Sequence, residues 1–268
     1  MKNNVLYYSV GPLLYCPANR ISITDSLINE RFGNRFSLAL CLEDTINDDH
    51  VEEAEQILIF SLSQIFIQHE QKAILSAKIF IRVRNPQQIQ RLTKALGQSI
   101  KIVTGFIVPK FSPDNAQSYI EQMILVNELV AKKLYMMPIY ESPSIIDLRN
   151  RIDILYLLRD SLARIEDLIL NIRVGGNDLC HMFGFRRHAN ESIYSIRPVS
   201  DIFSDIITVY GMDYVISGPV WEYYAGDGWK EGMIQEIPGG QTLRFHRKNR
   251  YPPFTDPCSK QSLSGFTK

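Results

Sequence analysis

The stretch Leu134-Tyr135-Met136-Met137-Pro138-Ile139-Tyr140-Glu141 places a carboxylate directly after an apolar run of strand length. The same arrangement recurs downstream, where the apolar run 168–174 and a turn at 175–177 are followed by Asp178. In a barrel of parallel strands such positions lie on the C-terminal rim, where active sites are built. Two carboxylates on neighbouring strand ends also suit a hard divalent cation such as Mg²⁺.

Short apolar runs alternate with longer amphipathic segments along the chain, the pattern of repeated βα units around a parallel sheet. The expected strands are residues 5–9 running on to 15, then 36–42, 78–83, 100–108, 133–140, 168–174 and 213–217. The expected helices are residues 51–69, 86–96, 114–132, 144–165 and 199–210. A (β/α)8 barrel needs an eighth strand. The fold expected is therefore an α/β, TIM-type barrel that lacks its eighth strand.

The bulk composition limits the class of protein. The chain has 268 residues with 29 basic and 29 acidic side chains, enough for one large domain and without the charge excess of a nucleic-acid or membrane-surface protein. No signal-peptide core and no apolar stretch long enough to span a bilayer is evident. The four cysteines lack CxxC spacing, so neither a zinc site nor a disulfide framework is indicated. A cytoplasmic protein with reduced thiols is expected.

The tail differs from the rest of the chain. We expect a domain at residues 1–237, whereas residues 238–268 hold four prolines and six Lys or Arg against one Asp, with no apolar periodicity. One interpretation is a basic disordered tail. A second is a frameshift: read one base later, residues 244–256 can spell Gly-Phe-Ile-Gly-Lys-Thr-Ala-Ile-His-Pro-Ser-Gln-Ile with permitted synonymous codons. That string has the apolar run and polar rim of an eighth strand, so we predict one inserted base near codon 237.

The strand-end motifs resemble the citrate lyase beta subunit and HpcH/HpaI aldolase family, metal-dependent carbon–carbon lyases on a TIM barrel. The family patterns D-L-E-D-A-V, V-R-V-N, L-P-K, P-L-I-E-[TS] and G-x-[ED]-D-L are matched in order by residues 40–46, 81–86, 108–110, 138–142 and 176–179. The shifted frame adds a match to the family's G-K-x-x-I-H-P. The sequences of these motifs are most similar to the divergent branch of the family that is encoded beside tellurium-resistance genes and thought to serve a biosynthetic pathway.

The resemblance implies that Glu141 and Asp178 hold Mg²⁺ or Mn²⁺ and that Arg82 binds a carboxylate or carbonyl oxygen of the substrate. We assign Glu43 and Asp44 to the catalytic group as residues that support the site from behind, although they could instead cap a helix or pair with Arg82. The reaction implied is cleavage or formation of a bond next to a carbonyl through a metal-stabilised enolate.

Two further cations extend the expected substrate site. Arg84 stands at the usual Asn position and adds a second guanidinium, and Lys110 ends the fourth strand. The substrate expected is a small oxo acid, acyl thioester or phosphorylated compound. The family's barrels often assemble, so a homo-oligomer is compatible with the resemblance.

Each of these residues also has a structural interpretation. Glu141 could be a solvated loop carboxylate or an ion-pair partner of Arg82, and Asp178 could cap a short helix. Lys110 could neutralise an acidic rim. His181, three residues past Asp178, is a weaker candidate for a third ligand, because a single His is more often structural. The run at 186–188 could clamp a phosphate or form a solvated face.

Departures from the family pattern bear on function. Cys41 stands where the family has its first Asp, and Asn177 stands where an acid often sits. Losing the eighth strand would leave the first and seventh strands with unpaired edges, so an alternative function is an inactive truncated fragment or a binding scaffold. A further alternative is other metal–enolate chemistry on the same barrel, such as thioester hydrolysis.

Overall fold

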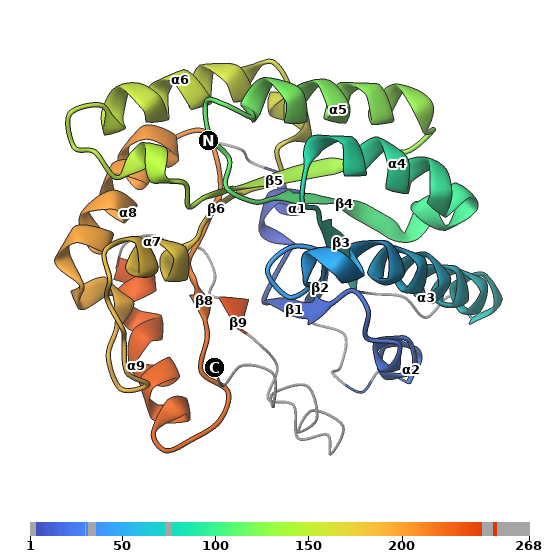
Figure 1. Ribbon diagram of the computed structural model, residues 1–268, viewed down its shortest axis with the longest axis horizontal. Helices are drawn as coiled ribbons and strands as arrows, with labels where there is room; N and C mark the ends of the chain where they lie inside the picture. Colours follow the sequence, from blue (N-terminus) through green and yellow to red (C-terminus); the bar gives the residue numbers. More distant parts are fainter. Residues whose placement is uncertain (1–3, 30, 32–35, 73–76, 243–248, 251–268) are drawn as a thin grey trace.

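A curled sheet of parallel strands forms the centre of the computed structural model, and helices cover its outer face (Figure 1). The structure describes residues 4–29, 31, 36–72, 77–242 and 249–250. The strands are β1 (Leu13–Pro17), β2 (Ser37–Cys41), β3 (Lys78–Arg82), β4 (Val103–Val108), β5 (Tyr135–Tyr140), β6 (Ile172–Val174), β7 (Ile216–Ser217), β8 (Val220–Trp221) and β9 (Asn249–Arg250). The helices are α1 (Val5–Tyr8), α2 (Ser22–Ile28), α3 (Val51–Lys72), α4 (Pro86–Leu96), α5 (Ala116–Leu129), α6 (Arg151–Ala163), α7 (Gly176–Met182), α8 (Arg197–Tyr210) and α9 (Trp229–Thr242).

The sheet follows the order β7-β6-β5-β4-β3-β2-β1-β9-β8, and every pairing is parallel. The strands at its two ends, β7 and β8, are separated only by Gly218 and Pro219, so the sheet curls round on itself. The eighth position, between β8 and β1, holds only the two-residue β9, which meets β1 at the single pair Leu14 and Arg250. The expected α/β barrel of the TIM type, without a full eighth strand in the described residues, is confirmed.

The N-terminal strand was predicted too early. Residues 5–8 form the short helix α1 instead, because the Asn4 side chain accepts a hydrogen bond from the Leu6 N–H (2.9 Å) and caps the helix. Gly11 then takes a positive φ of 68°, which a residue with a side chain adopts at a cost, and the strand begins at Leu13. Other elements are also shorter than expected. Strand β4 begins only after a 3₁₀ segment at 97–102, β6 begins at Ile172 and β7 at Ile216. Helix α5 spans Ala116–Leu129, and α6 spans Arg151–Ala163.

Helix α4 shows how local sequence sets an element. The Asn85 side chain accepts the Gln88 N–H (3.0 Å), and Pro86 occupies the first turn, where its missing N–H costs nothing. Its buried apolar residues, Ile89, Leu92 and Leu96, follow helical spacing and face the sheet. The helix has the bounds expected from the sequence.

The strands divide the core into two layers. In β5, Met136 and Tyr140 pack in the large cluster between sheet and helices, whereas Met137 and Ile139 pack with Phe80 in a smaller cluster inside the barrel. Because side chains alternate along a strand, the residue after Tyr140 also points inward, at the barrel mouth. The pleat of β5 therefore directs the candidate acid Glu141 toward the barrel mouth.

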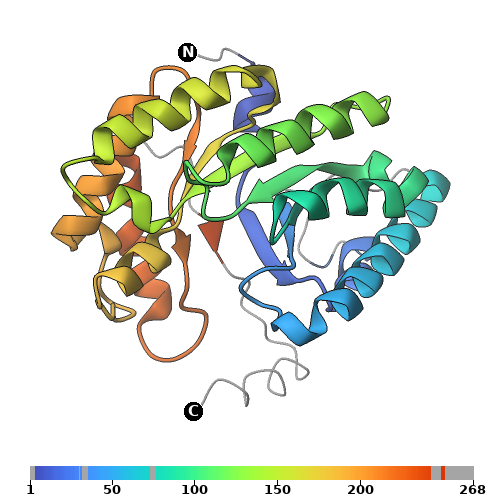
Figure 2. The ribbon, with the colours of Figure 1, turned by 45° about the horizontal axis from the view of Figure 1, so that its top comes forward.

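Helices α4, α5 and α6 lie beside one another over β3 to β6, as Figure 2 shows. Figure 1 shows no described helix between α9 and α2, next to the place of β9. None of the helices formed by the described residues combines the length and apolarity needed to cross a bilayer.

Candidate active site

Glu141 is held at the barrel mouth against the end of β6. Glu141 is 4% exposed, and its Oε1 accepts hydrogen bonds from the Lys110 backbone N–H (3.2 Å) and from Arg82 Nη2 (3.1 Å). A Cβ at Gly175 would lie 2.0 Å from Glu141 Oε2, so only a glycine leaves room for this carboxylate. The first glycine of the Gly-Gly-Asn-Asp motif is therefore part of the site.

The Glu141 carboxyl is poorly stabilised as an anion by the protein alone. Burial raises its pKa to about 8; Arg82 and the Lys110 N–H oppose the rise, while the charge and hydrogen bonding of Asp178 add to it. The buried carboxyl group of Glu141 thus meets the half-buried carboxyl group of Asp178 at neighbouring strand ends. A divalent cation would relieve their repulsion, and carboxylate oxygens are the ligands that Mg²⁺ prefers.

Asp178 is the third residue of α7, and Gly175 holds the N-cap position without any side-chain cap. The capping role considered for Asp178 is therefore not the one observed. His181 lies on the same helix and is exposed. Among the described residues, no three His, Cys, Asp or Glu side chains come together as a metal-binding group, so His181 does not join the carboxylate pair. A donor set of Glu141 and Asp178 would fit Mg²⁺, which commonly uses one or two carboxylates plus water and substrate oxygens.

Arg82 joins three carboxylates in this mouth. Its Nη2 lies 2.6 Å from Glu43 Oε2, 2.8 Å from Asp44 Oδ2 and 3.1 Å from Glu141 Oε1. The Arg82 side chain is 7% exposed, and its Nε has no hydrogen-bond partner. The guanidinium thus sits buried between the end of β2 and the end of β5.

Lys110 reaches the same cluster from the end of β4. Its Nζ contacts Glu43 Oε1 at 2.6 Å and Asp44 Oδ1 at 3.5 Å. The Lys110 backbone has a φ of 48°, an uncommon conformation for a residue with a side chain, and the Asn115 side chain secures it by donating to the Lys110 carbonyl (2.9 Å). Backbone strain of this kind concentrates at functional sites.

The ionisation of the cluster follows from these contacts. Burial raises the pKa of Glu43. Burial works against ionisation of Asp44 too, but its hydrogen bond with Glu43 and the charges of Arg82 and Lys110 outweigh it and lower its pKa. For Lys110, burial is outweighed by the hydrogen bond to Glu43, so its pKa is raised and the ammonium stays charged.

Arg84 is placed differently from Arg82, although only one residue separates them. Its guanidinium donates to the backbone carbonyls of Leu42 (3.0 Å), Glu43 (3.2 Å) and Ile46 (2.6 Å), and it pairs with Asp48. The residue predicted to bind substrate thus holds the loop after β2, which carries Glu43 and Asp44. In this structure its contacts are with that loop.

Two residues of the site were missed by the sequence analysis. Tyr15 of β1 lies between the guanidinium groups of Arg82 (6.0 Å) and Arg173 (5.6 Å), measured to its ring centroid. Arg173 of β6 is buried, and its Nε and Nη1 have no hydrogen-bond partner. A cation inside the apolar run 168–174 was the available signal. Both face the barrel interior, one layer below Glu141.

The comparisons with known proteins agree with this architecture. Residues 4–243 match the model of a family described as C-C bond lyase of the TIM-barrel fold. The citrate lyase beta subunit from M. tuberculosis, complexed with oxaloacetate and magnesium, is similar at a TM-score of 0.57 and 15% identity, over 97% of this chain and 99% of that one.

A second structure of that protein, with magnesium and pyruvate, gives a TM-score of 0.55 at 15% identity, over 96% and 91% of the two chains. A Haloferax volcanii malate synthase in a pyruvate and acetyl-CoA ternary complex gives 0.60 at 14% identity, over 87% and 67%. No curated protein sequence matches the chain. At such identities these likenesses show the fold, and the family match confirms the family expected from the strand-end motifs.

Proposed function

The chain belongs to the family of C–C bond lyases of the TIM-barrel fold, and we propose that it uses Mg²⁺, held by Glu141 and Asp178, to break or form a carbon–carbon bond next to a carbonyl. The observation that carries this proposal is the meeting of two carboxyl groups in a buried cradle, with the Glu141 pKa raised to about 8. Two similar solved structures of 15% identity contain magnesium with small oxo acids, which supports the choice of ion.

In this proposal the cation and each residue around it have a separate role in the reaction. When bound, the cation supplies Lewis-acid stabilisation of the negative charge that develops on a substrate carbonyl oxygen. Arg82 offers a buried guanidinium beside the same place, and its fork suits a carboxylate or carbonyl oxygen. Glu43 and Asp44 orient Arg82 through their ion pairs, and Lys110 keeps the cluster from excess negative charge.

Metal binding is the direct test. Mg²⁺ should raise the melting temperature of the protein, because a ligand that binds only the folded state stabilises it, by about 2.7 kcal/mol at a concentration of 100 Kd. Glu141→Gln and Asp178→Asn should each abolish the shift while leaving a cooperative melt. Mn²⁺ should substitute for Mg²⁺.

Asp201→Asn is a matched control, since Asp201 lies on α8 in an exposed pair with Arg197. It should keep the wild-type response to Mg²⁺. A wild-type protein that melts cooperatively and ignores both ions would contradict the proposal. Metal-dependent turnover of 2-oxo acids, acyl thioesters and sugar phosphates would then separate carbon–carbon cleavage from thioester hydrolysis.

The proposal extends to the tail, where we retain the inserted base near codon 237 and a domain of residues 1–237. Glu236 supports authentic reading up to that point, because it is fully buried, pairs with Arg187 and accepts the Ile193 N–H (2.8 Å). Immediately afterwards α9 contains Pro238, Gly239 and Gly240, three poor helix formers in succession. The rest of the predicted out-of-frame segment, apart from β9, lies outside the described residues.

The nucleotide sequence of codons 230–268 tests this proposal. Codons that cannot spell the shifted string would exclude it. A chain with the base removed should also melt at a higher temperature than the chain as written, because a full eighth strand would pair with β1 and β8.

A second candidate function is a binding scaffold without catalysis. It is favoured by the two-residue β9, which leaves most of β1 unpaired on that side in the described structure. Two proteins would be compared, the 268-residue chain and the frame-corrected chain. This alternative is supported if the 268-residue chain binds Mg²⁺ and small oxo acids without converting them, while the frame-corrected chain converts them.

A further inference from the structure

A pocket of about 280 Å³ opens on the same rim as the proposed metal site. It is formed by α7, by the segment after α7 and by the segment after β8, and its lining includes Asn177, His181, Phe185, Arg186 and Tyr223. Asn177 directly precedes the proposed ligand Asp178. The pocket therefore shares helix α7 with the proposed ligand Asp178.

The two adjacent arginines of the lining have opposite surroundings. Arg187 is buried, paired with Glu222 (3.1 Å) and with Glu236, and its guanidinium lies 5.0 Å from the Trp221 ring centroid. Its charge is met by the protein. Arg186 is exposed at the pocket and makes no ion pair or hydrogen bond with any described residue.

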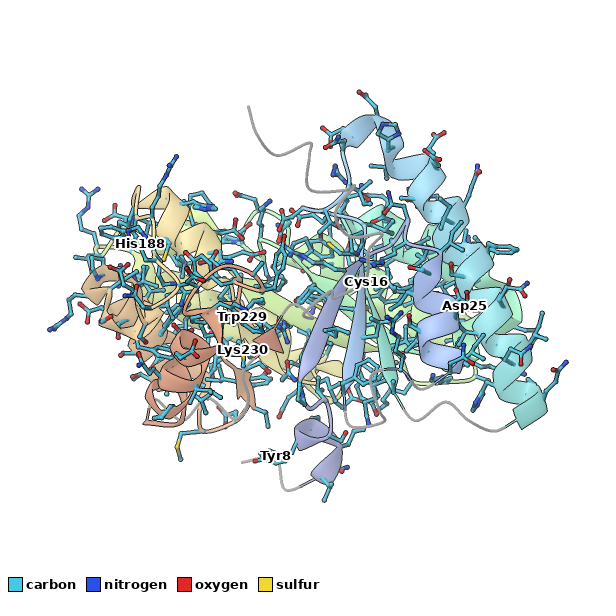
Figure 3. All side chains as sticks on the ribbon, turned by 90° about the horizontal axis from the view of Figure 1, so that it is seen from below. Tyr8, Cys16, Asp25, His188, Trp229 and Lys230 are labelled. Atoms are coloured by element: carbon cyan, nitrogen blue, oxygen red, sulfur yellow. The ribbon has the colours of Figure 1, made fainter. Side chains whose placement is uncertain are left out.

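Other polar groups of the pocket are also incompletely used. Oδ1 of Asn177 is buried without a hydrogen-bond partner, and because the oxygen and nitrogen of an amide exchange places on a flip, this side chain can offer its NH₂ inward. His181 adds a ring N–H from α7. Glu222 is the one carboxylate of the lining, and it is occupied by Arg187. Figure 3 shows His188, next to this arginine pair, on the side of the molecule that also carries Trp229 and Lys230 of α9.

The size of the pocket limits its ligand. Sites for drug-sized molecules hold about 300–1,000 Å³, so 280 Å³ suits a compact group with a few carbons and not a whole nucleotide carrier. A phosphoryl group has three acceptor oxygens, which match a guanidinium fork, an imidazole N–H and an amide NH₂ converging from three residues.

We propose that this pocket binds the phosphoryl group of a small phosphorylated substrate, with Arg186 as its main cationic contact. The carbonyl end of the same substrate then extends past Asn177 to Glu141 and Asp178. This second half rests on the proposed function, whereas phosphate binding by the pocket does not.

Inorganic phosphate, titrated calorimetrically into the full 268-residue chain at constant ionic strength, tests the pocket. Arg186→Ala should weaken phosphate binding about tenfold or more, the loss expected for a charge-assisted hydrogen bond. Arg186→Lys should weaken it less, since the charge remains and the fork is lost. Arg149→Ala is the matched control, because Arg149 is also an exposed arginine but is paired with Asp147 before α6; it should bind phosphate as the wild type does.

Three results would overturn the proposal. They are wild-type phosphate binding by Arg186→Ala, equal loss in Arg149→Ala, and acetate binding as tight as phosphate. The metal response separates the two proposals: Glu141→Gln should lose the Mg²⁺ shift and keep phosphate binding, and Arg186→Ala should do the reverse. Failure of only one of these two readouts identifies which proposal is wrong.

Discussion

Two buried arginines of this barrel, each surrounded by carboxylates, have different fates. Arg187 packs against Trp221 and shares its donors between Glu222 and Glu236, and none of its side-chain nitrogens is without a partner. Arg82 directs one nitrogen at three carboxylates and leaves its Nε unused. Both groups are buried ion pairs, so burial and pairing alone do not identify a functional site.

The difference lies in what the surrounding protein completes. Around Arg187 the acids are satisfied, since Glu236 also receives a backbone N–H. Around Arg82, Glu141 likewise accepts a backbone N–H, from Lys110, yet burial and the neighbouring Asp178 still raise the pKa of Glu141 to about 8. The first cluster is complete without a ligand and fixes α9 to the barrel, whereas the second is where we propose that a cation and a substrate bind.

The strongest test of this contrast removes the satisfied arginine. Arg187→Ala should lower the free energy of unfolding by about 3–5 kcal/mol, because Glu236 is left as a buried charge without its counterion. Arg197→Ala, in an exposed pair with Asp201, should cost at most about 1 kcal/mol. Urea denaturation of both variants measures the difference, and similar losses would remove the distinction between the clusters.

The pH dependence of stability is the next test. Because Glu141 has a folded-state pKa of about 8 against an ordinary value of 4.5, the folded protein without metal binds a proton more tightly than the unfolded chain does. Its contribution to stability is full below about pH 4.5 and is lost as the pH rises through about 8, with a slope of at most about 1.4 kcal/mol per pH unit.

Denaturation in EDTA between pH 5 and pH 8 would show this slope. The isosteric change Glu141→Gln removes the titrating group and should flatten the curve in that window. A slope of the same size in the variant would assign the effect to other groups.

Gly175→Ala probes the cradle. The added Cβ would lie 2.0 Å from Glu141 Oε2 and must displace the carboxylate, at a cost of about 1–3 kcal/mol. It should also weaken the Mg²⁺ response, because the displaced oxygen is a proposed ligand. Gly184→Ala is a useful comparison: it meets no atom within 4 Å, but its φ of 72° adds backbone strain, so it should lower stability without changing the Mg²⁺ response.

Arg84→Lys should have the smallest effect, about 1 kcal/mol, because a lysine keeps the charge and can serve one of the three carbonyls that Arg84 holds. A substrate-binding role would instead leave stability unchanged and raise KM once a substrate is known. Thermal melts and kinetics of the same variant distinguish these outcomes.

The amino-acid sequence is sufficient to predict the barrel architecture and the two rim carboxylates, Glu141 and Asp178. The alternation of apolar runs with amphipathic segments predicts the barrel, since each strand and helix shows its own period in a short window. Glu141 and Asp178 could be predicted from the sequence for the same reason: parallel strands bring their carboxyl ends to one rim, whatever the details of packing. The start of β1 could not be predicted from the apolar pattern, because a helix cap at Asn4 and a turn at Gly11 outweigh that pattern locally.

The surroundings of neighbouring arginines, in contrast, are visible only in the folded chain. Arg82 faces the barrel mouth and Arg84 holds the loop after β2, although both follow the same apolar run. Arg187 is neutralised by Glu236, 49 residues away in sequence, whereas its neighbour Arg186 faces a pocket. A charge is satisfied or left available by groups that the fold brings from distant segments, and the sequence pattern near one residue carries no information about those groups.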